Sequence, residues 1–190
     1  ALDEGLTGME FAAGIPGTLG GAVVMNAGAY GGEMKDVLKE VLVMDAQGKI
    51  FRLQNEELKL GYRTSIVKEK DYIVLAAVLE LKKGDKTEIR KCMEELRERR
   101  SEKQPLDMPS AGSTFKRPRG YFAGKLIMTA GLRGFSVGGA QISEKHCGFV
   151  VNKGGATAQD VLDLIKEVQK RVREKFGVEL ETEVKFLGEF

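Results

Sequence analysis

Apolar positions along this chain fall in short runs that polar and glycine-rich stretches separate. Residues 37–45 (VLKEVLVMD) and 49–54 (KIFRLQ) lie on either side of Ala-Gln-Gly, a pattern that predicts two strands joined by a turn. The longest apolar run, residues 72–84 (YIVLAAVLELKKG), is typical of a buried strand that ends at Gly84. Residues 147–152 (CGFVVN) predict another strand.

Two charged segments have the spacing of amphipathic helices. Residues 157–177 begin with a threonine cap and end at a glycine, which makes them the clearest helix of the chain. The other helix, residues 87–103, should end before Pro105 and carries apolar Ile89, Cys92, Met93 and Leu96.

The last segment, residues 179–190, alternates as a strand. The mixture of helices and strands indicates an α+β fold.

Composition narrows the classes of function. The 190 residues are 42% hydrophobic and 31% charged, as in an ordinary globular protein. A net charge of +2 provides no overall field that would attract nucleic acid or an anionic membrane, so a local site must meet any anionic ligand. We expect Cys92 and Cys147 to be free thiols, because their spacing suits no metal motif.

The sequence shows neither a membrane-spanning run nor a leader pattern. No apolar stretch approaches the roughly 20 residues that span a bilayer, and no basic-then-apolar leader opens the chain. We therefore expect a cytoplasmic location and no membrane partner. The chain opens at ALDEGLTGMEF without an initiator methionine, which indicates a fragment or a processed chain.

Glycine is concentrated in residues 14–32 (GIPGTLGGAVVMNAGAYGG) and again in residues 131–139. In the first cluster, consecutive small residues allow backbone amides to approach a phosphate or the edge of a flavin ring. Tight turns alone explain the cluster equally well. The segment is not the G-x-G-x-x-G fingerprint of a dinucleotide-binding strand-helix turn.

Two further segments contain candidate anion-binding groups. In LGYRTS, Arg63 stands beside Tyr62, and its guanidinium suits a carboxylate; a structurally paired arginine is the competing interpretation. In PSAGSTFKRP, Gly112 permits close approach to a ligand and Ser113 presents a hydroxyl beside two cations, although serines in such a stretch often serve only as caps or turns. Acyl transfer is disfavoured because no sequence partner of Ser113 indicates a hydrolase triad.

The last candidates are His146, the sole histidine, and two carboxylates near the end of the chain. His146 lies in a polar loop that leads into an apolar strand, so it is either a satisfied structural histidine or a ligand contact. Glu181 and Glu183 are expected on one face of a strand, where they face solvent or a cleft.

Taken in order, these motifs resemble the UDP-N-acetylenolpyruvoylglucosamine reductase family (MurB) over essentially the whole chain. The chain is similar to the shorter second type of that family, because no residue matches the tyrosine loop of the longer type. The motifs are GIPGTLGGAVVMNAGAYGGE, YRTS, AGSTFKRP, GGAQISEKHCGFVVN, TAQDV and LETEVKFLG.

The resemblance implies a vanillyl-alcohol-oxidase-like fold. Residues 1–84 would be the C-terminal portion of its FAD-binding domain, and residues 85–190 a smaller α+β substrate-binding domain. It also implies a reaction of peptidoglycan synthesis, in which NADPH reduces FAD and reduced FAD reduces UDP-N-acetylglucosamine enolpyruvate to UDP-N-acetylmuramate. Hydride reaches carbon 3 of the enolpyruvyl ether, and carbon 2 then needs a proton.

The resemblance also assigns roles to residues. Ser113 would donate the proton to carbon 2, Arg63 would pair with the substrate carboxylate as it gains enolate charge, and Glu183 would assist. Substrate contacts would come from Tyr62, Lys103, Lys116, Arg117 and His146. FAD contacts would come from Gly14, Ile15, Pro16, Gly17, Thr18, Gly20, Gly21, Asn26 and Gly28.

One departure leaves two other functions open. In the family, a region with a Gly-Ser-Asn loop that grips the FAD pyrophosphate precedes the segment GLTGMEFA, and this chain starts after it. A nucleotide-sugar-binding module that does not retain FAD is therefore an alternative. An oxidase of the same superfamily acting on another substrate is a third, disfavoured because removal of hydride from a carbinol usually needs a base and Ser113 suits proton donation.

Overall fold

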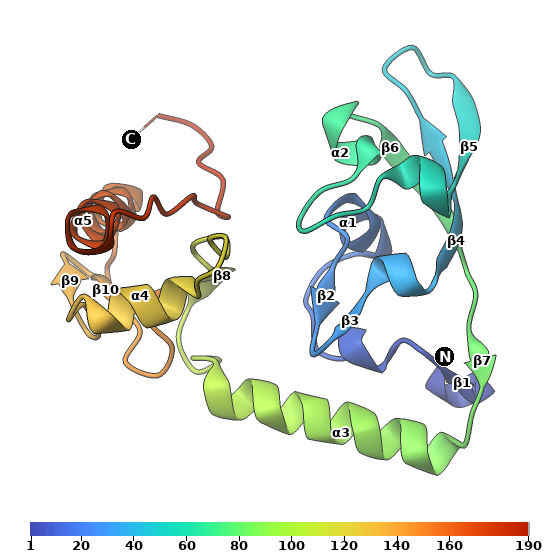
Figure 1. The fold of residues 1–190 in the computed structure, drawn as a ribbon, viewed down its shortest axis with the longest axis horizontal. Helices are drawn as coiled ribbons and strands as arrows, with labels where there is room; N and C mark the ends of the chain where they lie inside the picture. Colours follow the sequence, from blue (N-terminus) through green and yellow to red (C-terminus); the bar gives the residue numbers. More distant parts are fainter. Residues whose placement is uncertain (190) are drawn as a thin grey trace. The chain divides into compact units, whose positions relative to one another are not determined.

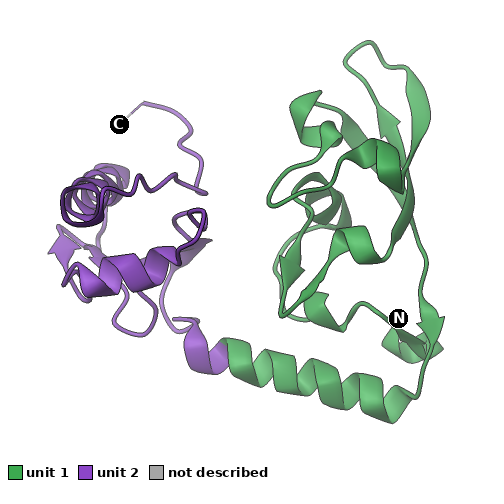
Figure 2. Ribbon diagram, in the orientation of Figure 1, with its two compact units in different colours: residues 1–100 green, residues 101–190 purple. Residues whose placement is uncertain are grey.

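The computed structural model describes residues 1–189 and divides into two compact units, Ala1–Arg100 and Ser101–Phe190, shown in Figure 2. Strands and helices occur in both units, and the α+β fold class is confirmed. The units part near the end of helix α3 (Lys86–Lys103), whereas the sequence places the domain boundary just before that helix. The assignment of domains to residues 1–84 and 85–190 stays a prediction.

The first unit is built around a three-stranded antiparallel sheet in the order β5-β4-β6 (Figure 1). The predicted pair of strands with an intervening turn is confirmed, since Val41 of β4 lies opposite Leu53 of β5. On its other side Val41 lies opposite Ala77 of β6. The three strands are β4 (Leu38–Met44), β5 (Ile50–Gln54) and β6 (Ile73–Leu79).

Strand β6 differs from its predicted burial. The long apolar run does form this strand, but Ile73, Leu75 and Val78 are 55%, 45% and 45% exposed. The prediction of a buried strand is therefore wrong. The physical reason is that the side chains of a strand point to opposite faces: some, such as Val74 and Leu79, pack on the core of the unit, and the others point away from it.

Short elements surround this sheet. Helix α1 (Leu19–Val24) begins after Thr18, whose Oγ1 accepts a hydrogen bond from Gly21 N at 3.1 Å. The remaining elements of the unit are β1 (Leu6–Thr7), β2 (Gly28–Ala29), β3 (Gly32–Glu33), α2 (Ile66–Glu69), β7 (Lys82–Lys83) and the 3-10 helices Leu2–Glu4, Glu10–Ala12, Met34–Asp36 and Asn55–Leu58. Strand β1 pairs with β7, and β2 with β3.

Helix α3 confirms the predicted charged helix but not its predicted burial pattern. Of the four apolar residues expected on one face, only Ile89 is buried, and Cys92 is exposed. The second buried side chain of the helix is Arg100, a charged residue that the apolar pattern does not select. Contacts with the rest of the first unit therefore decide the packing of α3.

The second unit combines a four-stranded antiparallel sheet in the order β8-β11-β10-β9 with two helices. Helix α5 is the predicted helix, and it contacts β9, β10 and α4. Its Thr157 cap is confirmed, because Thr157 Oγ1 accepts from Asp160 N at 3.0 Å. The elements are β8 (Ser110–Ser113), α4 (Ala123–Thr129), β9 (Ser136–Val137), β10 (Ala140–Ile142), β11 (Phe149–Asn152) and α5 (Ala158–Phe176).

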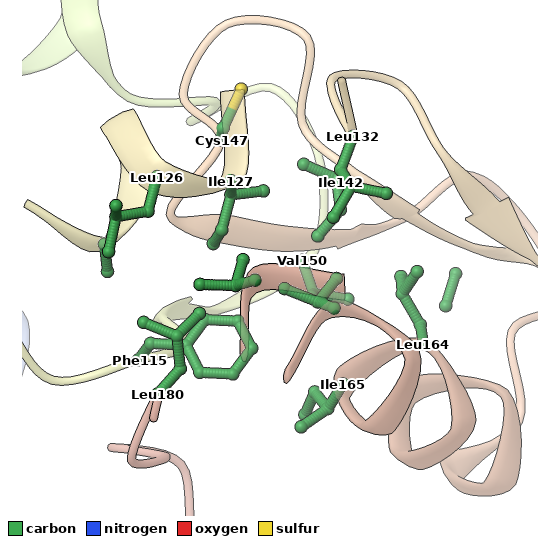
Figure 3. Packing of buried hydrophobic residues seen from close by; sticks show 14 residues of the cluster. Phe115, Leu126, Ile127, Leu132, Ile142, Cys147, Val150, Leu164, Ile165 and Leu180 are labelled. Atoms are coloured by element: carbon green, nitrogen blue, oxygen red, sulfur yellow. The ribbon is translucent and has the colours of Figure 1, made fainter. Parts of the chain in front are cut away.

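The core of the second unit lies where the two helices meet the sheet (Figure 3). Ile127 of α4 and Ile165 of α5 point into one cluster with Ile142 of β10, and all three are almost fully buried. Cys147 is buried in the same cluster as a free thiol. Burial of this apolar surface holds in place β8, which ends at Ser113, and β11, which follows the loop of His146.

The strand predicted for residues 179–190 is not formed over the described residues 179–189. The segment makes only an isolated antiparallel bridge, between Phe115 and Thr182. The alternation of polar and apolar residues does mark its inward side, because Val184 packs against the core and Leu187 is 87% exposed. The segment is not a strand, because backbone pairing does not continue on either side of this bridge.

Gly139 provides a test of the packing between β10 and the loop before α5. A Cβ atom at this position would lie 2.5 Å from Ala156 N and from Gly154 O, both backbone atoms that cannot move independently. We expect Gly139→Ala to lower the free energy of unfolding by about 1–3 kcal/mol, measured by urea denaturation. Gly20→Ala is the control, since Gly20 does not have a positive φ and its Cβ would make only ordinary contacts, at 3.6 Å or more. Equal losses in both variants would contradict the clash.

Candidate functional site

The glycine-rich loop leading into α1 has an open backbone. Gly17 has a φ of +138°, which L residues rarely adopt, and a Cβ atom there would meet nothing within 4 Å. Gly14 also has a positive φ, +77°. Both residues are exposed, so backbone groups of this loop can approach a ligand.

Asn26, just after α1, ties the end of this helix to the turn that carries Arg63. Its side chain is 2% exposed; Nδ2 donates to Gly61 O at 3.2 Å, and Oδ1 accepts from Lys35 N at 2.9 Å. The carboxamide is therefore occupied by backbone groups in this structure. Asn26 as a direct FAD contact stays a prediction, and what the geometry supports is a positioning role.

Ser65 makes a second link between the end of α1 and this turn, and the motifs assign no separate role to it. It is fully buried, its Oγ donates to Val24 O at 2.7 Å, and the same oxygen accepts from Lys68 N at 3.2 Å. Ser65 thus caps α2 and joins it to the end of α1. The signal was available, because a serine before an apolar helical start is a capping residue.

Arg63 sits at the tip of this turn in a strained conformation. Its φ is +56°, and its carbonyl oxygen accepts from Lys68 Nζ at 3.0 Å. Its guanidinium carbon lies 5.4 Å from the ring centroid of Tyr62, which is 56% exposed. A non-glycine residue held at positive φ costs about 1–3 kcal/mol and is frequent at functional sites. The first unit therefore brings the end of α1 close to the turn that carries the predicted pair Tyr62 and Arg63.

Gly28 has a packing reason to be glycine. A Cβ atom there would lie 2.9 Å from Gly32 O and from the Glu33 Cβ, within the β2-β3 hairpin. For Gly28, close packing of the hairpin alone accounts for the glycine. Its role in FAD binding stays a prediction.

In the second unit, hydrogen bonds from both sides hold the segment around Ser113. Thr114 N donates to Gly148 O, and Glu183 N donates to Thr114 O, each at 2.8 Å. The buried Thr114 Oγ1 accepts from Val150 N at 3.0 Å. The structure thus brings Ser113 and Glu183 into one region, with Ser113 exposed at the end of β8. Gly112, at φ +85°, leaves the approach to Ser113 open.

Gly148 lies between Ser113 and His146. A Cβ atom on Gly148 would lie 2.9 Å from His146 Cε1 and 3.6 Å from Ser113 Oγ, so any larger residue would crowd both side chains. The sequence motifs do not single out Gly148, whose one signal is a glycine at the point where the polar loop enters the strand. The structure therefore places His146 near Ser113.

His146 is held as a neutral hydrogen-bond donor. Burial lowers the pKa of its imidazole below the usual value, although a backbone hydrogen bond opposes this in part. Nδ1 accepts from Gly148 N at 3.1 Å, and the ring meets Phe149 edge-on with 5.0 Å between centroids. With Nδ1 used as an acceptor, the proton of the neutral ring is on Nε2. His146 therefore cannot take a proton from Ser113 through Nδ1.

The predicted cations have different surroundings. Lys116 forms an ion pair with Glu181, and Lys116 N donates to Glu181 O at 2.8 Å. The guanidinium carbon of Arg117 lies 4.0 Å from the ring centroid of Phe122. Lys103 ends α3 and is exposed. Substrate contacts by these cations stay predictions.

A cleft of about 470 Å³ opens beside β8 in the second unit. Ser110, Ala111 and Thr114 line one part of it, and Val150, Val161 and Phe186 contribute apolar surface. Within residues 1–189, no three His, Cys, Asp or Glu side chains gather as a metal ion would require. In the same described range, no helix is both long and apolar enough to cross a membrane.

Comparisons with known proteins match the first and the last part of the chain to two different family models. Residues 1–54 match the family model of an FAD binding domain. Residues 104–187 match the model of the C-terminal domain of UDP-N-acetylenolpyruvoylglucosamine reductase. The class is therefore a protein with an FAD-binding domain followed by a reductase C-terminal domain.

Individual relatives extend the match over both units. The chain is 63% identical over its whole length to UDP-N-acetylenolpyruvoylglucosamine reductase of Caldanaerobacter subterraneus subsp. tengcongensis and 65% identical to that of Agathobacter rectalis. It is similar to the crystal structure of UDP-N-acetylenolpyruvylglucosamine reductase (MurB) from Thermus caldophilus, with a TM-score of 0.83 and 44% identity. That match covers 96% of this chain and 66% of the solved one. The chain belongs to the UDP-N-acetylenolpyruvoylglucosamine reductase family, and it spans 63% and 60% of the two curated relatives.

Proposed function

We propose that this chain is part of a cytoplasmic flavin-dependent oxidoreductase of peptidoglycan synthesis that uses NADPH to reduce UDP-N-acetylglucosamine enolpyruvate to UDP-N-acetylmuramate. The observation that carries the proposal is the setting of Ser113, an exposed hydroxyl whose neighbour His146 presents Nε2–H and uses Nδ1 for Gly148. This arrangement lacks the serine-imidazole acceptor of a hydrolase and leaves the serine as a proton donor.

The glycine loop of the first unit fits a bound dinucleotide. Gly17 leaves its backbone uncovered, and Thr18 holds the start of α1. When bound, FAD that NADPH has reduced supplies the hydride for carbon 3 of the enolpyruvyl ether. The residues proposed to hold it are Gly14, Ile15, Pro16, Gly17, Thr18, Gly20, Gly21, Asn26 and Gly28.

Ser113 then donates its hydroxyl proton to carbon 2 of the substrate. A serine is a weak acid, so this step requires a strongly basic carbon and a site from which water is excluded. Gly112 supports the role because its open space allows the substrate to approach the hydroxyl. Glu183, fixed beside Thr114 through its backbone, assists at the same substrate carbon.

Arg63 stabilises the charge that develops on the substrate carboxylate as carbon 2 becomes carbanionic. Its planar guanidinium can donate two hydrogen bonds to the carboxylate, and these strengthen as enolate charge grows. Tyr62, Lys103, Lys116, Arg117 and His146 complete the proposed substrate contacts. Lys116 would exchange its ion pair with Glu181 for a substrate anion.

The first test is flavin retention followed by turnover. We expect the protein, expressed at the length of its relatives, to retain a stoichiometric amount of FAD in its visible spectrum and to oxidise NADPH only when the enolpyruvyl substrate is present. Gly17→Val is the control, since a β-branched residue cannot hold φ near +138° without strain and should weaken FAD binding. A colourless protein that still binds the uridine nucleotide would contradict the proposal and indicate a binding module.

A further inference from the structure

Arg100 is a buried charged residue that neither the motifs nor the proposed reaction uses. It lies in the last turns of α3 and is 9% exposed, whereas Arg97 and Arg99 of the same helix are exposed. Arginine side chains are rarely buried to this degree unless a partner compensates the charge. Its position therefore needs a physical explanation.

No protein group among the described residues satisfies two of its donors. Nε and Nη2 of Arg100 are buried and have no hydrogen-bond partner. The guanidinium carbon lies 5.6 Å from the ring centroid of Tyr30. A ring face attracts the positive charge but does not accept the in-plane N–H bonds. Leaving such donors unpaired is unfavourable, and more so when the group is charged.

One of these donors, Nε, lies beside the glycine loop proposed to hold the cofactor. A Cβ atom on Gly14 would lie 3.5 Å from Arg100 Nε and 3.7 Å from Arg100 Cδ. Because residue 14 is a glycine, none of its atoms beyond the backbone lies beside the guanidinium. Nε–H and Nη2–H form the fork that matches two neighbouring acceptor atoms.

We infer that Arg100 is a further cofactor-binding residue, whose Nε–H and Nη2–H donate to a pair of electron-rich acceptors on the flavin nucleotide. This rests on the proposed function, because it takes the ligand of the glycine loop to be FAD. The shared chemistry is an anionic acceptor pair, which FAD offers both at its diphosphate and at the pyrimidine edge of the reduced ring. The ring of Tyr30, with its centroid 5.6 Å from the guanidinium carbon, adds a cation–π contact but no hydrogen-bond acceptor.

The test is made on the protein at the length of its relatives. It compares thermal stability with FAD binding, which the same substitution should affect differently. In Arg100→Met, an apolar side chain of similar length replaces the unsatisfied charge, so without FAD we expect an unchanged or raised Tm. The dissociation constant for FAD should rise at least about tenfold, because two charge-assisted hydrogen bonds are lost. Arg99→Met, on the exposed side of α3, should change neither quantity.

Two further measurements separate the two acceptor pairs. If the fork faces the flavin ring, the reduction potential of bound flavin should fall in Arg100→Met, since the cation no longer stabilises the anionic reduced ring. If it faces the diphosphate, FAD affinity should fall with an unchanged potential. Arg100→Lys should recover part of the affinity in either case, because it restores the charge without the fork.

An unchanged FAD affinity in Arg100→Met would overturn the inference. So would an equal loss of Tm with and without FAD, which would make Arg100 a structural residue only. Both results presuppose that the unmodified protein binds FAD. If the unmodified protein binds none, the proposed function fails, and the inference fails with it.

Discussion

Replacing Ser113 with alanine is expected to lower kcat for reduction of the enolpyruvyl substrate by about 10²–10⁴-fold, the usual contribution of a positioned proton donor. Reduction of the bound flavin by NADPH should continue at its normal rate. The reason is that, in the proposed reaction, the hydroxyl acts only after hydride has reached the substrate, when carbon 2 needs a proton. Stopped-flow absorbance follows the two half-reactions separately.

The matched control for this prediction is Ser136→Ala, an exposed serine on β9 of the same sheet. It should leave both half-reactions unchanged. A loss of flavin reduction together with substrate reduction in Ser113→Ala would show that Ser113 supports the site as a whole and does not donate the proton.

Replacing Arg63 is expected to lower kcat by about 10²–10³-fold, as when one group that stabilises a developing anion is removed. KM should change little, because the guanidinium matters most after charge has moved onto the substrate carboxylate. Steady-state kinetics of Arg63→Gly and Arg63→Ala measure the effect. A rise in KM alone would instead make Arg63 a ground-state binding residue.

The strained backbone at Arg63 allows function and stability to be separated. At a φ of +56°, glycine is relaxed and alanine is strained, so Arg63→Gly should be more stable than Arg63→Ala while both lose the same activity. Arg52→Ala is the control, since Arg52 is an exposed cation paired with Glu40 on the adjacent sheet. If activity followed stability across these variants, the assigned role of Arg63 would be wrong.

Local patterns in the sequence were sufficient for most of the regular elements. Thr157 and Gly177 marked both ends of α5, because a cap and a left-handed terminal glycine act within a few residues of their own position. The strand pair around Gly48 and the charged helix α3 followed from the same short-range rules. The order of the motifs also sufficed to identify the family, which the comparisons confirm.

Side-chain surroundings depended on contacts between residues far apart in the chain. The side-chain amide of Asn26 donates a hydrogen bond to Gly61, 35 residues away. Arg100 is buried beside Gly14 and Tyr30, which the apolar periodicity of α3 does not predict. The exposure of β6 and the missing final strand likewise depend on which neighbours are present to cover or pair with them. The sequence by itself determined the elements and the family, because those depend on local preferences and motif order. Only the tertiary structure decided which polar groups are satisfied, because a hydrogen bond or a buried charge depends on what the fold places next to it.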